Sequence, residues 1–175
     1  MPLNLIKVYP ALLELDHLQD GQRRASLIGV FKRDIEDNPG FGFRGKKIWP
    51  IKTEVEAMQV LFTHLTCGTE DVEENGQKFK RRIFDYHRSK RLHWVRHHVE
   101  EKKKVDVEVF SAEERVNGRN VFRTYIYDTI EEYIIVLEPQ RTGTDYYLLT
   151  AHHLTEDWAK KAMAKRMKRK LLDIL

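Results

Sequence analysis

The fold is decided by residues 105–154, which read VDVEVFSAEERVNGRNVFRTYIYDTIEEYIIVLEPQRTGTDYYLLTAHHL. Four segments in this stretch alternate in polarity or are rich in β-branched and aromatic residues, as strands are. The predicted strands are residues 105–110, 121–128, 132–138 and 145–154. The links between them are too short for a crossover helix, and one contains the turn pair Asn117-Gly118. The stretch therefore predicts a four-stranded antiparallel sheet.

Helical patterns precede this sheet. Residues 10–37 repeat apolar side chains at spacings of three and four, which predicts a helix pair. Residues 38–51 are rich in glycine, proline and aromatic residues and predict a loop or small hairpin. Thr53 and Glu56 have the spacing of a capping box and predict the start of another helix.

A composition change at residues 69–77 suggests two regions. This stretch is acidic and contains Gly76, and nothing in its composition predicts a packed core. We expect a helical region at residues 1–76 and an α+β domain at residues 77–175. In the second region a helix at residues 81–101 leads into the sheet, and Thr155 caps a basic C-terminal helix. The predicted fold class is therefore α+β.

The overall composition is that of a globular protein, with 41% hydrophobic and 33% charged residues. Cys67 is the single cysteine, which excludes an internal disulfide and suits a reducing compartment. We find neither a signal sequence nor an apolar run of about 20 residues, the length that a membrane span needs. These features predict a soluble, cytoplasmic protein without a membrane partner.

Positive charge is concentrated in two runs, although the net charge is only +4. Residues 77–104 are dense in lysine, arginine and histidine, and residues 160–170 read KKAMAKRMKRK. Concentrated positive charge is typical of a surface that binds a phosphate backbone. A solvated helix face is the alternative explanation for either run alone.

The parity of the strands predicts which polar side chains share a face of the sheet. Alternate residues of a strand point to the same side, so Arg123, Tyr125 and Tyr127 form one set. Thr150 and His152 form the matching set on the last strand. If the apolar sets point at the helices, these five side chains share an open face.

This set suits the cleavage of RNA by transesterification. The reaction needs a base for the 2′-hydroxyl proton, an acid for the leaving 5′ oxygen and a cation for the phosphate, but no metal. His152 is the candidate acid or base and Arg123 the phosphate ligand. Tyr125 or Tyr146 would stack a nucleobase or donate a hydrogen bond, and Thr150 would orient the phosphate. Alternatively, Arg123 pairs with a strand glutamate, Glu108 or Glu132, and His152 is only a surface residue.

Four motifs resemble those of the phage- and toxin-associated nucleases of the barnase, colicin and RelE-like superfamily. They are RLHWV (91–95), FRTYIYD (122–128), EYIIVLE (132–138) and YYLLTAHHL (146–154). The resemblance covers residues 81–175. It implies a toxin-like, metal-independent endoribonuclease, with tRNA or mRNA as the substrate, no cofactor, and an inhibitor protein that covers the basic face.

The resemblance also implies a site. In such families the site combines a histidine or basic residue of the helix with Arg-Thr on a central strand and Thr or His on the last strand. Here the Arg-Thr pair is Arg123-Thr124. The catalytic candidates are Arg123, Thr150, His152, His93 and His97, and the nucleic-acid-binding candidates are Arg91, Tyr125, Tyr146, Lys165, Arg166 and Arg169. The chain differs from the pattern in its long N-terminal region and in offering only Glu132 or Glu138 as a base glutamate.

Two other interpretations of these residues remain open. His93 and His97 stand four apart, which is metal-ligand spacing, and His152-His153 could add a third imidazole. The carboxylates of a zinc-protease motif are missing beside them. The second alternative is a non-catalytic module of the same fold that binds nucleic acid or protein.

Overall fold

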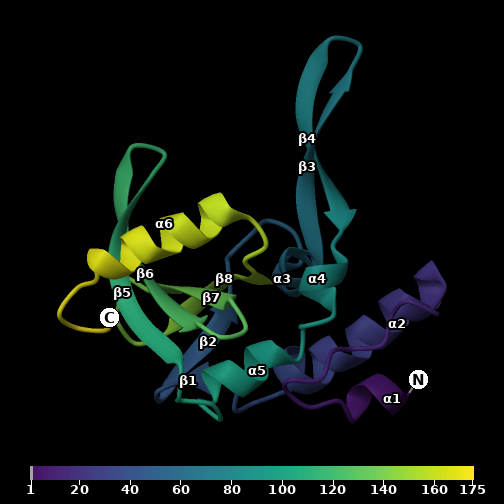
Figure 1. Cartoon of the computed structure of the whole chain (residues 1–175), viewed down its shortest axis with the longest axis horizontal. Coiled ribbons are helices and arrows are strands. Elements are labelled where there is room, and N and C mark those ends of the chain that lie inside the picture. Colours follow the sequence, from purple (N-terminus) through teal and green to yellow (C-terminus); the bar gives the residue numbers. More distant parts are fainter. Residues whose placement is uncertain (1) are drawn as a thin grey trace.

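The computed structural model describes residues 2–175, an α+β chain with one large and one small sheet (Figure 1). The strands of the large sheet are β1 (Gly42–Phe43), β2 (Lys46–Pro50), β5 (Val107–Val116), β6 (Arg119–Asp128), β7 (Tyr133–Pro139) and β8 (Tyr146–His153). The small sheet consists of β3 (Cys67–Glu74) and β4 (Gln77–Phe84). The helices are α1 (Pro2–Leu5), α2 (Asp20–Phe31), the π-helical turn η1 (Lys32–Glu36), α3 (Ala57–Thr66), α4 (Tyr86–Ser89), α5 (Trp94–Val99) and α6 (Asp157–Lys168).

The prediction of a four-stranded antiparallel sheet is wrong. The large sheet has six strands in the order β1-β2-β8-β7-β6-β5, and β2 pairs with β8 in parallel. The extra strands come from the glycine-rich stretch at residues 38–51, which was expected to be a loop or small hairpin and forms the β1–β2 hairpin; its pairing with the large sheet was not predicted. Ile48 of β2 is 4% exposed and lies opposite Tyr146, so burial of one apolar residue against a distant strand fixes this segment. Pro50 ends the strand, where proline is tolerated.

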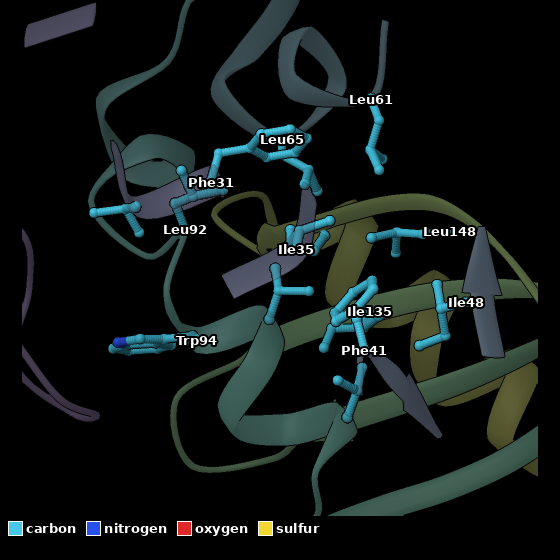
Figure 2. Close-up of a cluster of buried hydrophobic side chains, with 14 of the residues drawn as sticks. Phe31, Ile35, Phe41, Ile48, Leu61, Leu65, Leu92, Trp94, Ile135 and Leu148 are labelled. Atoms are coloured by element: carbon cyan, nitrogen blue, oxygen red, sulfur yellow. The ribbon is translucent and has the colours of Figure 1, made fainter. Parts of the chain in front are cut away.

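The sheet lies between two helical layers. On one face α2, η1, α3 and α5 bury the main core, which joins Phe31, Leu65 and Trp94 of the helices to Ile135 and Leu148 of the sheet (Figure 2). On the other face α6 crosses the strands alone (Figure 1). Ile134 of β7 therefore packs in the cluster beneath α6, whereas its neighbour Ile135 packs in the main core.

The main core does not follow the expected division into residues 1–76 and 77–175. Phe31 and Leu65 precede the proposed boundary, whereas Ile135 and Leu148 follow it, and all four belong to one buried cluster. The boundary segment forms the turn and part of the strands of the β3–β4 hairpin. The first region also contains strands, so it is not the purely helical unit that was predicted.

The hairpin turn carries a sequence signal that the prediction missed. Asn75 and Gly76 have φ values of 52° and 74°, the left-handed conformation of a tight two-residue hairpin turn. Asn117 and Gly118 adopt the same conformation, with φ values of 49° and 76°, at the turn that was predicted. The same dipeptide thus marks both hairpins, but acidic neighbours hid the first one.

Several helix boundaries also differ from the prediction. The first long helix begins only at Asp20, and β4 runs to Phe84, so residues 81–101 are not one helix. The helix expected to follow Thr53 begins at Ala57, and the Thr53 hydroxyl instead donates to the Val55 carbonyl at 2.6 Å. Among residues 2–175, no helix combines the length and apolar character that crossing a membrane requires.

Candidate nucleic-acid site

The pairing register places the predicted polar set on one face of the sheet. Tyr125 lies opposite Val136, which lies opposite Thr150. One row further along, Tyr127 and His152 flank Ile134 in the same way. Strands β6 and β8 are therefore separated by β7 but point these side chains toward the same layer.

This face is not open, as had been expected, because α6 covers it. Met163 of α6 is 1% exposed and packs with Tyr125, Ile134 and Val136. The helix covers the face because its small and sulfur-containing side chains bury an apolar patch between the polar residues of the strands.

A cavity of ≈ 350 Å³ remains between α6 and the sheet. Its polar lining comes from Arg123, Thr150, His152 and Arg166, together with the indole of Trp158. Arg123 and Arg166, which are more than 40 positions apart in sequence, thus line the same cavity. The volume lies within the range of roughly 300–1,000 Å³ that is typical of small-ligand sites.

His152 is a neutral imidazole in this cavity at neutral pH. Burial and, to a lesser extent, the positive charge of Arg88 lower the pKa of His152 from 6.5 to about 4. The Nδ1 atom of His152 is buried and has no hydrogen-bond partner among residues 2–175. A neutral ring with a free nitrogen can accept a proton, so His152 suits a general base better than a general acid.

Arg123 supplies the unpaired cation of the cavity. Its buried Nε has no hydrogen-bond partner within the described chain, and it forms no salt bridge there. The alternative pairing with a strand glutamate does not occur, since Glu132 binds Lys160 at 2.8 Å and Glu108 lies opposite Tyr127. An unpaired buried guanidinium nitrogen is costly and is typical of a site that receives an anion.

Arg166 and Tyr125 are held by a single carboxylate. Glu114 accepts hydrogen bonds from Arg166 Nε at 2.8 Å and from the Tyr125 hydroxyl at 3.1 Å. Burial and the charge of Glu114 raise the pKa of Tyr125 to about 12. Tyr125 is only 2% exposed and stacks on Phe110, so it cannot be the platform for a nucleobase that was predicted.

Arg88 of α4 is a site residue that the sequence did not single out. Its Nη1 donates to the His64 carbonyl at 2.6 Å and lies 3.4 Å from the Thr150 hydroxyl. Its Nε is buried without a partner among residues 2–175, and Asp85 Oδ2 is 3.9 Å away. The basic run at residues 77–104 signalled positive charge here, but only the tertiary structure brings this arginine to Thr150.

The two helix histidines lie on the other side of the sheet from the cavity. His93 is 5% exposed, its Nε2 lies 2.8 Å from the Ala11 carbonyl, and burial lowers its pKa to about 4. His97 stacks on Tyr9 with ring centroids 4.5 Å apart. Their placement with His152 in one catalytic site was therefore wrong, because the α5 layer packs on the opposite face.

The remaining candidates are divided between the two sides. Tyr146 is 2% exposed on the main-core face, and its hydroxyl donates to the Leu175 carbonyl, so its predicted stacking role is wrong. Arg91 donates to the His87 carbonyl at 2.8 Å and lies over Trp94. Lys165 and Arg169 are exposed on α6 and at its C-terminal end.

Metal coordination does not explain the histidines. Within residues 2–175, no three histidine, cysteine, aspartate or glutamate side chains gather as metal ligands would. The spacing of His93 and His97 is instead explained by packing against Ala11 and Tyr9.

Comparisons with known proteins give no relative from which the role of these residues could be inferred. No model of a protein family matches the chain, and the searches of curated proteins and of solved structures gave no match either.

Proposed function

We propose that the chain binds RNA at the cavity beneath α6 and cleaves it there without a metal. The observation that carries the proposal is that Arg123, with an unpaired Nε, and His152, with an unpaired Nδ1, line the same cavity. One group suits a phosphate oxygen and the other suits a hydroxyl proton. The proposal agrees with the resemblance to the barnase, colicin and RelE-like nucleases.

The chemistry follows from these two groups. His152 Nδ1 takes the proton of the ribose 2′-hydroxyl, the 2′ oxygen bonds to phosphorus, and the bond from phosphorus to the 5′ oxygen breaks. Solvent water protonates the leaving 5′ oxygen. Arg123 stabilises the charge on the phosphate oxygens, and Arg88 holds Thr150 beside it. The products are a 2′,3′-cyclic phosphate and a 5′-hydroxyl end.

The surface of α6 extends this site along the RNA. Lys165 and Arg169 are exposed and supply positive charge for the backbone. Trp158 lines the cavity and is 73% exposed, so its ring is free to stack a nucleobase. Trp158 thus takes the role that the sequence had assigned to Tyr125 or Tyr146.

The test is incubation of the purified chain with total RNA in EDTA, followed by analysis of the fragment ends. We expect fragments that end in a cyclic phosphate, and at least about 100-fold slower cleavage for His152→Gln, since general bases contribute about that much or more. Arg119→Ala changes an exposed arginine of the same strand and is the matched control for Arg123→Ala. Cleavage that is unchanged in both site variants would show that any nuclease activity lies elsewhere.

A second candidate is RNA binding without cleavage, and one observation favours it. Helix α6 is fixed over the site by the buried Met163 and by the Arg166 to Glu114 pair, which limits access to His152. This function predicts that the wild-type chain binds single-stranded RNA and leaves it intact. Arg123→Ala would then weaken binding, whereas His152→Gln would not.

A further inference from the structure

The β3–β4 hairpin projects from the body of the protein as an arm that stands apart from the sheet (Figure 1). Each strand has eight residues, and the two strands pair along their whole length, from Cys67 with Phe84 to Glu74 with Gln77. A two-stranded hairpin is at best marginally stable in water unless one of its faces is covered. The arm is joined to the body only around its base, where Asp85 N donates to the Thr66 carbonyl at 3.0 Å.

One face of the arm is apolar at its centre. The pairing register puts Val72 beside Phe79, with Ile83 on the same face nearer the body. Phe79 is 42% exposed and Ile83 is 37% exposed. The opposite face carries the charged pairs Asp71 with Lys80 and Glu73 with Lys78, so only the first face offers apolar surface to a partner.

The charges of the arm are segregated by strand. The four acidic residues of β3 are Glu70, Asp71, Glu73 and Glu74, and the four basic residues of β4 are Lys78, Lys80, Arg81 and Arg82. The arm is therefore neutral overall, and its acidic strand opposes the approach of a nucleic-acid backbone. A protein partner with both signs of charge fits better.

The edges of the arm do not suit symmetric pairing with another arm. Two β3 edges would bring acidic strands together, and two β4 edges would bring basic strands together, which is unfavourable for directly opposed residues. In contrast, packing of two apolar faces with β3 of one arm over β4 of the other stacks the Glu70–Arg81 ion pair of one arm on the same pair of the second copy, with Glu70 opposite the second copy's Arg81. It also places Val72 opposite the second copy's Phe79.

We propose that the arm is a dimerisation element, and that its apolar face packs against the same face of a second copy of this chain with β3 over β4. Such an arrangement is self-complementary and closes as a twofold dimer. The contact area of two short hairpins is below that of a standard interface, so the dimer forms reversibly with rising concentration. This inference does not depend on what the cavity beneath α6 binds.

The first test compares neighbouring residues on the two faces of the arm in the full chain. Sedimentation equilibrium from micromolar to near-millimolar concentration should show a monomer–dimer equilibrium for the wild type. Phe79→Gln should weaken dimerisation about tenfold or more, because it removes the central apolar contact. Lys80→Gln, on the charged face, is the matched control and should change the dimerisation constant less than about twofold.

The second test checks which strands face each other. Glu70→Arg places two arginines side by side at positions 70 and 81 of the arm face, and Arg81→Glu places two glutamates there. Each variant alone should be monomeric, because like charges then oppose each other across the interface. An equimolar mixture should form dimers again, since every opposed pair in the mixed dimer has opposite charges.

Two outcomes would overturn the proposal. One is a wild-type chain that stays monomeric over the whole concentration range. This outcome overturns the proposal even if Phe79→Gln weakens RNA binding, because the arm would then contact RNA and not a second copy. The other is a mixture of the two charge variants that dimerises no better than either variant alone. Circular dichroism of each variant separates these outcomes from an unfolded arm.

Discussion

Two sets of buried polar groups on opposite faces of the large sheet differ in their hydrogen bonding. On the main-core face Asp128 is 0% exposed, and its carboxylate accepts from the Tyr9 hydroxyl at 2.8 Å, His98 Nε2 at 3.0 Å and Lys103 Nζ at 2.9 Å. On the α6 face Arg123 Nε and His152 Nδ1 are buried without partners among residues 2–175. Paired polar groups hold elements together, whereas unpaired ones are available to a ligand.

The paired cluster joins parts of the chain that are far apart in sequence. Tyr9 belongs to the N-terminal segment, His98 to α5, Lys103 to the following loop, and Asp128 ends β6. His98 is fixed from both sides, because its Nδ1 lies 2.9 Å from the Trp94 carbonyl. The Asp128 cluster thus links the N-terminal segment and α5 to the end of β6.

The largest expected effect is the loss of the Asp128 charge. Asp128→Asn should reduce the free energy of unfolding by about 3–5 kcal/mol, because it leaves the Lys103 ammonium without its counter-charge and removes a carboxylate that accepts hydrogen bonds from Tyr9 and His98. Urea denaturation measures the change. Asp71→Asn, on the exposed arm, is the control and should cost less than about 0.5 kcal/mol. A loss below about 1 kcal/mol at Asp128 would mean that the cluster does not hold the fold together.

The next effect compares two neighbouring isoleucines of β7. Ile135→Ala should cost about 3–4 kcal/mol in unfolding free energy, because Ile135 is 0% exposed in the main core. Ile134→Ala should cost about 2 kcal/mol, since Ile134 already borders the cavity and loses fewer packing contacts. Denaturation of both variants in the same buffer gives the difference. Equal costs would indicate that the two faces are packed equally well.

The pH dependence of stability sharpens the comparison on the α6 face. Burial lowers the pKa of His152 from 6.5 to about 4, so the unfolded chain binds a proton between these pH values that the folded chain does not. Stability is therefore lost as the pH falls from about 6.5 towards 4. His152→Asn should remove about 2 kcal/mol of the loss between about pH 7 and pH 4.5.

The control for this experiment is His17→Asn, at an exposed histidine. Burial also lowers the pKa values of His93 and His97 to about 4, so part of the acid sensitivity should persist in the His152 variant. An unchanged pH profile in that variant would contradict the assignment of a neutral, buried His152.

The smallest expected effect is a gain in stability. Arg123→Met keeps an unbranched side chain that ends where Nε stood and removes the unpaired guanidinium, which should raise the unfolding free energy by about 1 kcal/mol. The same change should abolish the proposed RNA binding. Thermal denaturation measures the change in stability, and a filter-binding assay measures the loss of RNA binding. A loss of stability would indicate that Arg123 has a structural partner in solution.

The strand pattern of residues 105–154 determined much of the architecture, and the missing parts have a common cause. Alternation predicted the segments that form β5 to β8 and the shared face of Arg123, Thr150 and His152, because parity is a local property. It did not reveal β2, since Ile48 becomes a strand residue only by lying beside Tyr146. It also missed the hairpin turn at Asn75-Gly76, although the dipeptide was visible.

The site was predicted only in part for a similar reason. The resemblance to the nuclease superfamily put His93 and His97 with the site, but packing places them in the layer on the opposite face of the sheet. Trp158 of α6 lines the cavity and Arg88 of α4 contacts Thr150, and local sequence pattern predicts neither contact. Helix α6 was expected, but the face that it covers was not.

The sequence by itself determined the composition, the segregation of charge in the arm, the antiparallel order of the last four strands and the common face of Arg123, Thr150 and His152. Only the tertiary structure decided that the sheet has six strands, that one core spans both halves of the chain, and that α6 covers Arg123 and His152. The physical reason is range: strand parity and turns depend on neighbouring residues, whereas burial depends on which distant surfaces exclude water together.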